Sequence, residues 1–229
     1  MRTNLIFPAT LMLVSIVASG HSGRQDSNGG HFDRKTGVYH CHGESCKEQH
    51  KKSKAALKEA VNDNRKFSLV YNRKDWSHWA DMDGDCQDSR VETLVRYSLK
   101  PVTFQNGDKC EEVVTGKWYD PYTDRYFTKA GKLDIDHRIA LEEAHKIGAS
   151  NWSRDRKKQF ANDPINIIPV YLSANRSKSS RFAYQWMPNN KAYWCEYIST
   201  RELVVKKYNL SPPKKELKYN QSVKDKYCN

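Results

Sequence analysis

Beyond its first 20 residues, the sequence has no apolar run long enough to cross a membrane. A helical span needs about 20 consecutive apolar residues, and the apolar run Leu5–Val17 is shorter and contains Pro8. This run follows Arg2 and precedes the small residues Ala18-Ser19-Gly20, a pattern typical of a secretory signal peptide that is cut after Gly20. We therefore expect a secreted or periplasmic protein without a transmembrane segment. An uncleaved N-terminal anchor is the alternative.

Acidic residues are also scarce relative to basic ones, and the chain has no internal repeat and no recognisable base-reading motif. There are 39 Lys and Arg against 27 Asp and Glu, and removal of the leader takes away only Arg2, so the net charge falls by one, from +12 to +11. This excess favours a polyanion partner, either nucleic acid or an anionic surface. Without a recognition helix, we expect contacts to the phosphate backbone with low sequence selectivity.

All six cysteines follow the expected leader. An even number in an exported chain indicates disulfides, and six cysteines allow 15 pairings. We prefer Cys86 with Cys110, Cys195 with Cys228, and a short loop closed by Cys41 and Cys46.

Residues 21–50 are rich in Gly, His and Asp and poor in aliphatic side chains, so they cannot build a conventional core. We expect a small module folded around a disulfide or a metal ion. Cys41, His42, Cys46 and His50 are residue types that bind zinc, but their spacing matches no strong zinc pattern. We favour the disulfide in an oxidising compartment. The run Tyr39-His40-Cys41-His42 resembles the YHYH module of some exported bacterial proteins.

The remaining chain is divided into a basic linker or helix at 51–72, a globular domain at 73–210 and a basic tail at 211–229 in which we expect little order. Strands are predicted at 67–71, 113–119, 132–135 and 166–170, and helices at 141–147, 153–160 and 172–181. Residues 90–100 fit either a helix or a strand. The fold class is therefore α+β.

The candidate chemistry lies in Asp134-Ile135-Asp136-His137, in Asn166 and in Asn175-Arg176-Ser177-Lys178. The predicted order is a strand that ends in Asp-His, an excursion, a second strand, and a helix that carries Asn. Carboxylate and amide oxygens bind hard divalent cations, which retain several waters. An imidazole with a pKa near 6.5 can take a proton from water. These are the parts that phosphodiester hydrolysis requires.

These motifs resemble the HNH endonucleases, and more closely the exported, DUF1524-like HNH proteins with the pattern D-x-D-H … N-D-x-x-N-L-I … N-x-S-K. The resemblance covers roughly residues 73–210. It also includes the stretches around Trp79-Ala80-Asp81, Gly116-Lys117-Trp118 and Trp186-Met187-Pro188. One departure is Ala140, because the family often has Pro three positions after its catalytic His.

The resemblance implies a ββα-metal (His-Me finger) core and a role for each matching residue. His137 would be the general base, Asp136 and Asn175 would bind the metal, and Asn166 would complete the catalytic set by bracing the loop that carries His137. Asp134 would orient His137 or water from outside the metal site. Phosphates would contact Arg176, Lys178 and Arg181.

The implied cofactor is one divalent ion, Mg²⁺ by preference, with Mn²⁺, Ca²⁺ and Zn²⁺ as alternatives. The sequence thus predicts a secreted, metal-dependent endonuclease of low sequence specificity that acts on DNA, with RNA as an alternative substrate. A non-catalytic basic protein that binds the cell envelope or nucleic acid is the competing hypothesis.

The run Asp81-Met82-Asp83-Gly84-Asp85 has the alternating carboxylates of a calcium loop. Gly84 stands at position 4 of such a loop and not at position 6, so an EF-hand is not expected. A simple turn is the favoured interpretation, with an irregular calcium site as the alternative.

Overall fold

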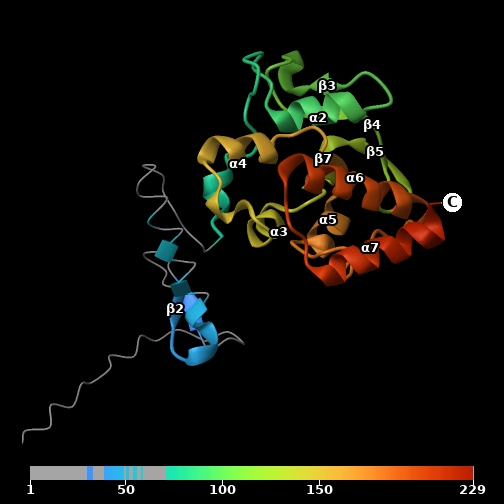
Figure 1. The fold of residues 1–229 in the computed structure, drawn as a ribbon. Helices are drawn as coiled ribbons and strands as arrows, with labels where there is room; N and C mark the ends of the chain where they lie inside the picture. The colour runs from blue at the N-terminus through green and yellow to red at the C-terminus, as the bar shows by residue number, and fades with distance from the viewer. Residues whose placement is uncertain are drawn as a thin grey trace, which may run out of the picture.

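The computed structural model describes residues 30–32, 39–48, 50–51, 54–55, 58 and 71–228 (Figure 1). The expected leader, most of the expected linker and residues 67–70 of a predicted strand lie outside these ranges. Within the described ranges, none of the helices has the length and apolar character that a membrane span requires.

The N-terminal module contains a two-stranded antiparallel hairpin. Strand β1 (Gly30–Phe32) pairs with β2 (Tyr39–Cys41), and a short 3₁₀ helix follows at Glu44–Cys46. Cys41 and Cys46 form a disulfide, as predicted. These two sulfurs are therefore not zinc ligands in this structure.

A three-stranded sheet and one helix form the first part of the larger domain. Strands β3 (Thr103–Phe104), β4 (Val113–Asp120) and β5 (Arg125–Lys129) are antiparallel in that order. Helix α2 (Ser89–Tyr97) begins after Asp88, whose side chain caps its N-terminus. The ambiguous stretch at 90–100 is thus mainly helical. The predicted Cys86–Cys110 disulfide is present.

The second sheet has two strands, and it is the part of the fold that positions the candidate site. Strand β6 (Leu133–His137) pairs antiparallel with β7 (Ile167–Tyr171), and His137 lies opposite Ile167. Helix α5 (Leu172–Lys178) follows β7 directly and packs against β6. The strand, strand and helix expected from the sequence are therefore present in that order.

Between β6 and β7 the chain forms α3 (Leu141–Lys146) and α4 (Arg154–Ala161). Gly148 follows α3 with a φ of 135°, a backbone conformation that favours glycine. Ser153 caps α4 by accepting a hydrogen bond from the backbone N–H of Arg156, as its position predicts. Short 3₁₀ helices complete the domain at Arg73–Trp76, Gln105–Gly107, Ala130–Lys132, Ala149–Asn151 and Lys191–Tyr193.

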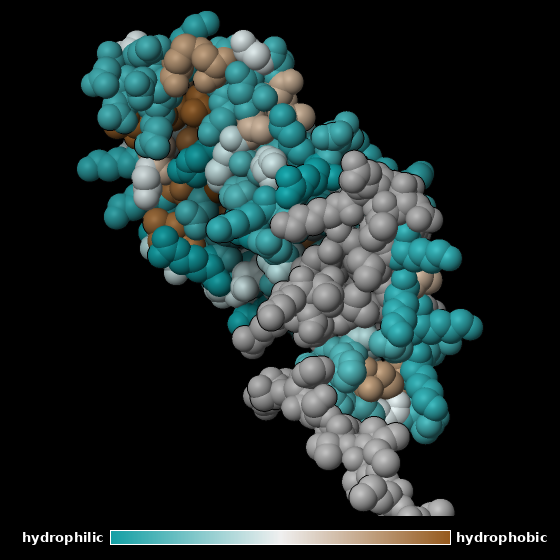
Figure 2. Space-filling model, turned by 90° about the vertical axis from the view of Figure 1, so that its left-hand side faces the viewer, coloured by the Kyte–Doolittle hydropathy of each residue, from teal (hydrophilic) through white to brown (hydrophobic). Residues whose placement is uncertain are grey.

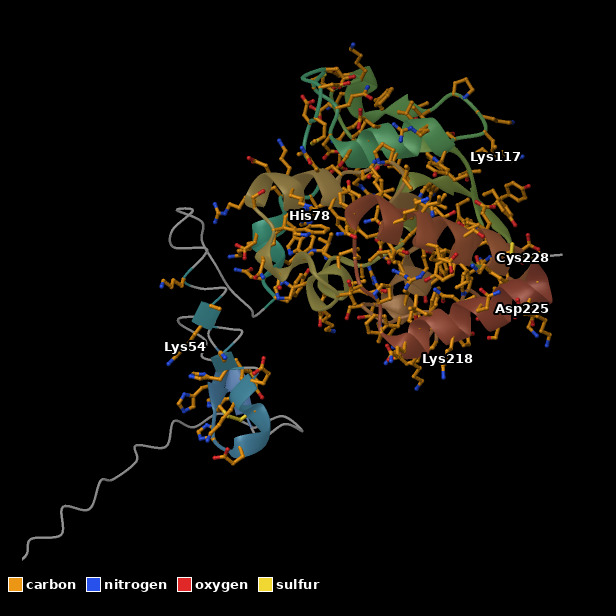
Figure 3. The ribbon with its side chains drawn as sticks, in the orientation of Figure 1. Lys54, His78, Lys117, Lys218, Asp225 and Cys228 are labelled. Carbon is orange, nitrogen blue, oxygen red and sulfur yellow. A yellow bond between two sulfur atoms is a disulfide. The ribbon has the colours of Figure 1, made fainter. Side chains whose placement is uncertain are left out.

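The prediction of little order after Leu210 is wrong. Helix α6 (Trp194–Tyr208) packs along α7 (Lys214–Tyr227), and Figure 1 shows the two helices side by side at the C-terminal end. Helix α7 exposes charged residues such as Lys218 and Asp225 (Figure 3) but buries Glu216, Asn220 and Val223 at helical spacing. The predicted Cys195–Cys228 disulfide ties its end to α6.

Candidate active site

The side chains of β6 divide between the core and a polar cluster on α5. Leu133 and Ile135 point into the hydrophobic core, and Asp134 and Asp136 alternate with them because successive side chains of a strand face opposite sides. Asn175 Nδ2 donates to Asp134 Oδ2 at 3.2 Å. Lys178 Nζ donates to Asp136 Oδ1 at 2.9 Å. Side chains from one face of α5 thus donate hydrogen bonds to both carboxylates of β6.

A cavity of about 380 Å³ lies where β6 ends. Asp136, His137, Asn175 and Arg176 all line it, so the structure brings together four of the predicted site residues. The cavity also has lining residues that the sequence did not point to. They are Tyr71 and Arg73 at the start of the larger domain, Leu141 and Glu142 from α3, and Ser179 and Ser180 after α5.

His137 is held as a neutral imidazole. Its Nε2 lies 2.8 Å from the carbonyl oxygen of Ala161, and since a carbonyl only accepts, Nε2 carries the hydrogen. The pKa of His137 is lowered to about 3, chiefly by burial and to a smaller extent by the positive charges of Arg73 and Lys178, whereas the contact with Ala161 opposes the shift. In this tautomer Nδ1 is the basic nitrogen.

Trp79 fixes the plane of the imidazole. The two rings stack with centroids 5.4 Å apart and an interplanar angle of 22°. Trp79 has a φ of 58°, which is uncommon for a bulky residue. The buried side chain of Asn162 holds this loop, because its amide donates to the Ser77 carbonyl and accepts from the Ala80 N–H. The contact of Trp79 with His137 was not foreseen from the sequence.

Asn166 holds the backbone that follows His137. Its side chain is fully buried, its Oδ1 accepts from the N–H of Ile139 at 2.9 Å, and its Nδ2 donates to the Ile139 carbonyl at 3.3 Å. Its backbone carbonyl also accepts from the N–H of Arg138. These bonds tie Asn166 to the two residues that follow His137. Asn166 does not line the cavity.

Asp136 is enclosed by two donors. Tyr122 donates to Asp136 Oδ2 at 2.6 Å, while Lys178 occupies Oδ1 and also donates to the His137 carbonyl. Burial, and then the charge of Asp136, raise the pKa of the Tyr122 hydroxyl well above its usual value. Lys178 itself is 0% exposed. The structure therefore places Lys178 on Asp136 and not at the surface, where the predicted phosphate contact would require it.

The two remaining predicted phosphate contacts are exposed arginines. Arg176 is 72% exposed and lies 3.9 Å from Asp134, an open ion pair that leaves the guanidinium accessible at the cavity. Arg181 donates to the Ser177 carbonyl and does not line the cavity. Arg73 is exposed, also lines the cavity and was not predicted. The only sequence signal for Arg73 is its positive charge.

A buried ionic network connects the C-terminal helices to this site. Arg201 of α6 pairs with Glu143 of α3 at 2.6 Å and with Glu216 of α7 at 2.9 Å. The same guanidinium donates to the carbonyl of Arg138, the residue after His137. Helix α7 thereby helps to hold the loop that carries the candidate base.

The carboxylates of the calcium-like loop lie within 4.8 Å of one another and are exposed. Asp81 accepts hydrogen bonds from the backbone N–H groups of Gly84 and Cys86, and these bonds lower the pKa of its carboxyl. Arg90 donates instead to the Leu133 carbonyl. The turn contacts account for this arrangement of the loop.

The fold and site together define an α+β domain compatible with an HNH-like nuclease. The sequence matches the family described as "GmrSD restriction endonucleases, C-terminal domain" over residues 89–219, more than half of the chain, and the protein belongs to this family. The matched region contains β6, β7 and α5. Membership associates the protein with nucleases and, through them, with nucleic acid.

One curated relative is an "Uncharacterized secreted protein" of Arthroderma benhamiae. It is 32% identical over 143 residues, which cover 62% of this chain and 68% of that protein. No solved structure matches the sequence. The secreted relative and the three disulfides are compatible with export.

Proposed function

We propose that this protein is an exported, metal-dependent endonuclease that hydrolyses phosphodiester bonds of DNA, with RNA as an alternative substrate. One observation carries the proposal: a buried, neutral imidazole opens onto the same cavity as a carboxylate, an amide and an exposed guanidinium. These groups supply a base, cation ligands and a phosphate contact within about 380 Å³. Nuclease family membership supports the same reaction class.

The donor atoms at the cavity fit a hard divalent cation, and we assign Mg²⁺ to Asp136 and Asn175. Each oxygen of Asp136 accepts one hydrogen bond and retains a lone pair, because a carboxylate offers about four acceptor positions. Asn175 uses its Nδ2 on Asp134, which leaves its Oδ1 without a hydrogen bond from the described residues. Two oxygen donors leave room for the waters that Mg²⁺ retains.

In the proposed reaction, Nδ1 of His137 accepts the proton of the attacking water, while Ala161 and Trp79 hold the ring in place. Arg176 and Arg73, which both line the cavity, bind non-bridging phosphate oxygens. Lys178 and Tyr122 fix the rotamer of Asp136. When bound, the metal ion supplies positive charge that neutralises the phosphate and the leaving 3′ oxygen.

The proposed substrate contacts are to phosphate and not to bases. The net charge of +12 favours any nucleic acid strand. The face in Figure 2 is largely hydrophilic, and its apolar residues form separate groups. We therefore expect cleavage of low sequence selectivity. The leader-like N-terminus, the disulfides and the secreted relative support the proposed export.

The test is digestion of plasmid DNA by the oxidised protein, with Mg²⁺ or with EDTA. We expect degradation that EDTA stops and that His137→Ala slows by about 10²–10⁴-fold, the usual contribution of a general base. DNA binding, measured by mobility shift, should persist in this variant. His42→Asn, an exposed histidine on the hairpin, is the matched control. Full cleavage by folded His137→Ala would refute the assignment, and a mobility shift without breakage in the unmodified protein would favour a binding protein.

A further inference from the structure

The N-terminal hairpin gathers histidines that the nuclease proposal does not use. His31 on β1 lies directly opposite His40 on β2, and paired residues of an antiparallel sheet have side chains on the same face. His42 follows the end of β2, and its ring lies beside those of His31 and His40. The ring centroids of His31 and His42 are 5.0 Å apart, those of His40 and His42 4.6 Å, and those of His31 and His40 5.6 Å.

Packing on the hairpin and a disulfide hold this cluster together. Tyr39 is 1% exposed and lies over Gly30, where an added Cβ would come within 2.5 Å of the tyrosine ring. Only glycine therefore allows this contact. Cys41 and Cys46 close the loop that contains His42. A module too small for a hydrophobic core thus presents its histidines from a cross-linked frame.

Three adjacent imidazoles are unfavourable when they carry positive charge, because like charges repel, so a ligand that binds all three would stabilise the cluster. His31 Nε2 is buried and forms no hydrogen bond with the described part of the chain. A metal ion would give such a nitrogen a partner and would turn the crowding of rings into a favourable contact. The disulfide removes both nearby thiolates as donors, so the available ligands are nitrogens.

We propose that His31, His40 and His42 form a binding site for one borderline divalent transition-metal ion, Zn²⁺ or Cu²⁺. Imidazole ligands suit these ions, whereas Mg²⁺ and Ca²⁺ require oxygen. The ring nitrogens of His31, His40 and His42 do not all lie within 4.8 Å of one another. Among the described residues, the carboxylates of Asp81, Asp83 and Asp85 do meet this spacing. Metal binding therefore requires the ring of His42, which is exposed, to rotate about its side-chain bonds toward the other two. The fourth position of a tetrahedral ion is left to water.

His50 stands beside the cluster as a support and not as a ligand. Its Nδ1 contacts the Tyr39 carbonyl, and its ring centroid is 6.5 Å from that of His40. The proposed site also differs in chemistry from the oxygen donors of Asp136 and Asn175. The two sites therefore select different metals, and the hairpin site does not depend on the nuclease proposal.

The experiment is calorimetric titration of metal-free, oxidised full-length protein with ZnCl₂ in the presence of excess Mg²⁺, which occupies the oxygen site. We expect one equivalent of Zn²⁺ to bind. His31→Asn and His42→Asn should each weaken binding by at least about tenfold, since loss of an outer-shell partner alone costs 10–100-fold. His78→Asn, in the larger domain (Figure 3), should bind as the unmodified protein does.

A second readout is the electron paramagnetic resonance spectrum of the Cu²⁺ complex. Coupling to three nitrogens is expected in the unmodified protein, and coupling to two in His42→Asn. Because His42 is exposed, this substitution removes a ligand without removing core packing, and mass spectrometry of the Cys41–Cys46 disulfide confirms that the module is intact. Unchanged Zn²⁺ affinity in His42→Asn would overturn the proposal. Mg²⁺-dependent cleavage should be unaffected in that variant, so failure of this site and failure of the nuclease are separate outcomes.

Discussion

Replacement of Lys178 by Met is the sharpest test of how Asp136 is held. Lys178 is 0% exposed and Asp136 is 4% exposed, and their charges meet at 2.9 Å. Removing one partner of a buried pair leaves the other charge buried and unpaired, which lowers the unfolding free energy by about 3–5 kcal/mol. For a chain of this size, that cost corresponds to a decrease in Tm of roughly 6–20 °C. Unfolding in urea or by calorimetry measures the change.

A matched control and a double variant separate the charge effect from packing. Lys146 pairs with Glu142 at 2.7 Å but is 49% exposed, so Lys146→Met should cost no more than about 1 kcal/mol. Asp136→Asn combined with Lys178→Met removes both charges and should be less destabilised than Lys178→Met alone. Equal losses in the single and the double variant would show that the ion pair is not the cause.

The same variant reports on the metal. Without Lys178, the carboxylate of Asp136 faces the cavity with Tyr122 as its remaining partner, so a cation should bind there more tightly. Mg²⁺ at tenfold its Kd should then restore about 1.4 kcal/mol of unfolding free energy. Addition of Asn175→Ala should reduce this recovery. If Mg²⁺ restores no stability to Lys178→Met, Asp136 is not a cation ligand, and the proposed site is refuted.

Three further predictions concern the base and its supports. Asn175→Ala should cleave more slowly and need more Mg²⁺ for half-maximal rate, and unchanged activity at limiting Mg²⁺ would argue against its role as a ligand. Asn166→Ala should cost about 1–3 kcal/mol, because the buried N–H of Ile139 loses its acceptor, and denaturant unfolding checks this value. The pKa of His137, lowered from 6.5 to about 3, should keep cleavage active well below pH 6.5. The same shift means that unfolding free energy falls as the pH decreases from 6.5 toward 3. An acid limb of the rate near pH 6.5, or an identical stability profile in His137→Ala, would contradict the shift.

Much of the strand–strand–helix unit could be predicted because its signals are local. Strand β6 alternates Leu133 and Ile135 with carboxylates, and Gly148 and Ser153 mark helix boundaries at the observed positions. The three disulfides were predicted correctly as well. Short-range order was sufficient for the strand and the helix boundaries, whereas two of the disulfides join residues 24 and 33 positions apart.

The C-terminal helix was missed because its stabilising contacts are long-range. A lysine-rich sequence after Pro212-Pro213 has the composition of a solvated tail. Its order depends on Glu216, which reaches Arg201 of α6 and the backbone N–H groups of Ala183 and Tyr184. Composition does not reveal that partnership, because the acid and its donors lie on different elements.

Trp79 shows a similar limit at the site itself. Two tryptophans three residues apart indicate a core, and Trp76 is indeed fully buried. Trp79 is partly buried against the core cluster that includes side chains of β6 and, with a φ of 58°, also stacks on His137. Its direction depends on Asn162, more than 80 residues away, which holds the carbonyl of Ser77.

The sequence and the structure give Lys178 different roles. The sequence predicts a phosphate contact, whereas in the structure Lys178 pairs with Asp136. In the family pattern it follows Asn175 by three positions, and one helical turn places both on the face of α5 that meets β6. Sequence order shows that this face meets the site, but not how deep each side chain lies. The depth decides the role: an ammonium at the rim binds phosphate, whereas a buried one must pair with a carboxylate. Because Lys178 already neutralises Asp136, a divalent ion must compete with a bound positive charge, and its affinity should be lower than two open oxygen ligands would provide.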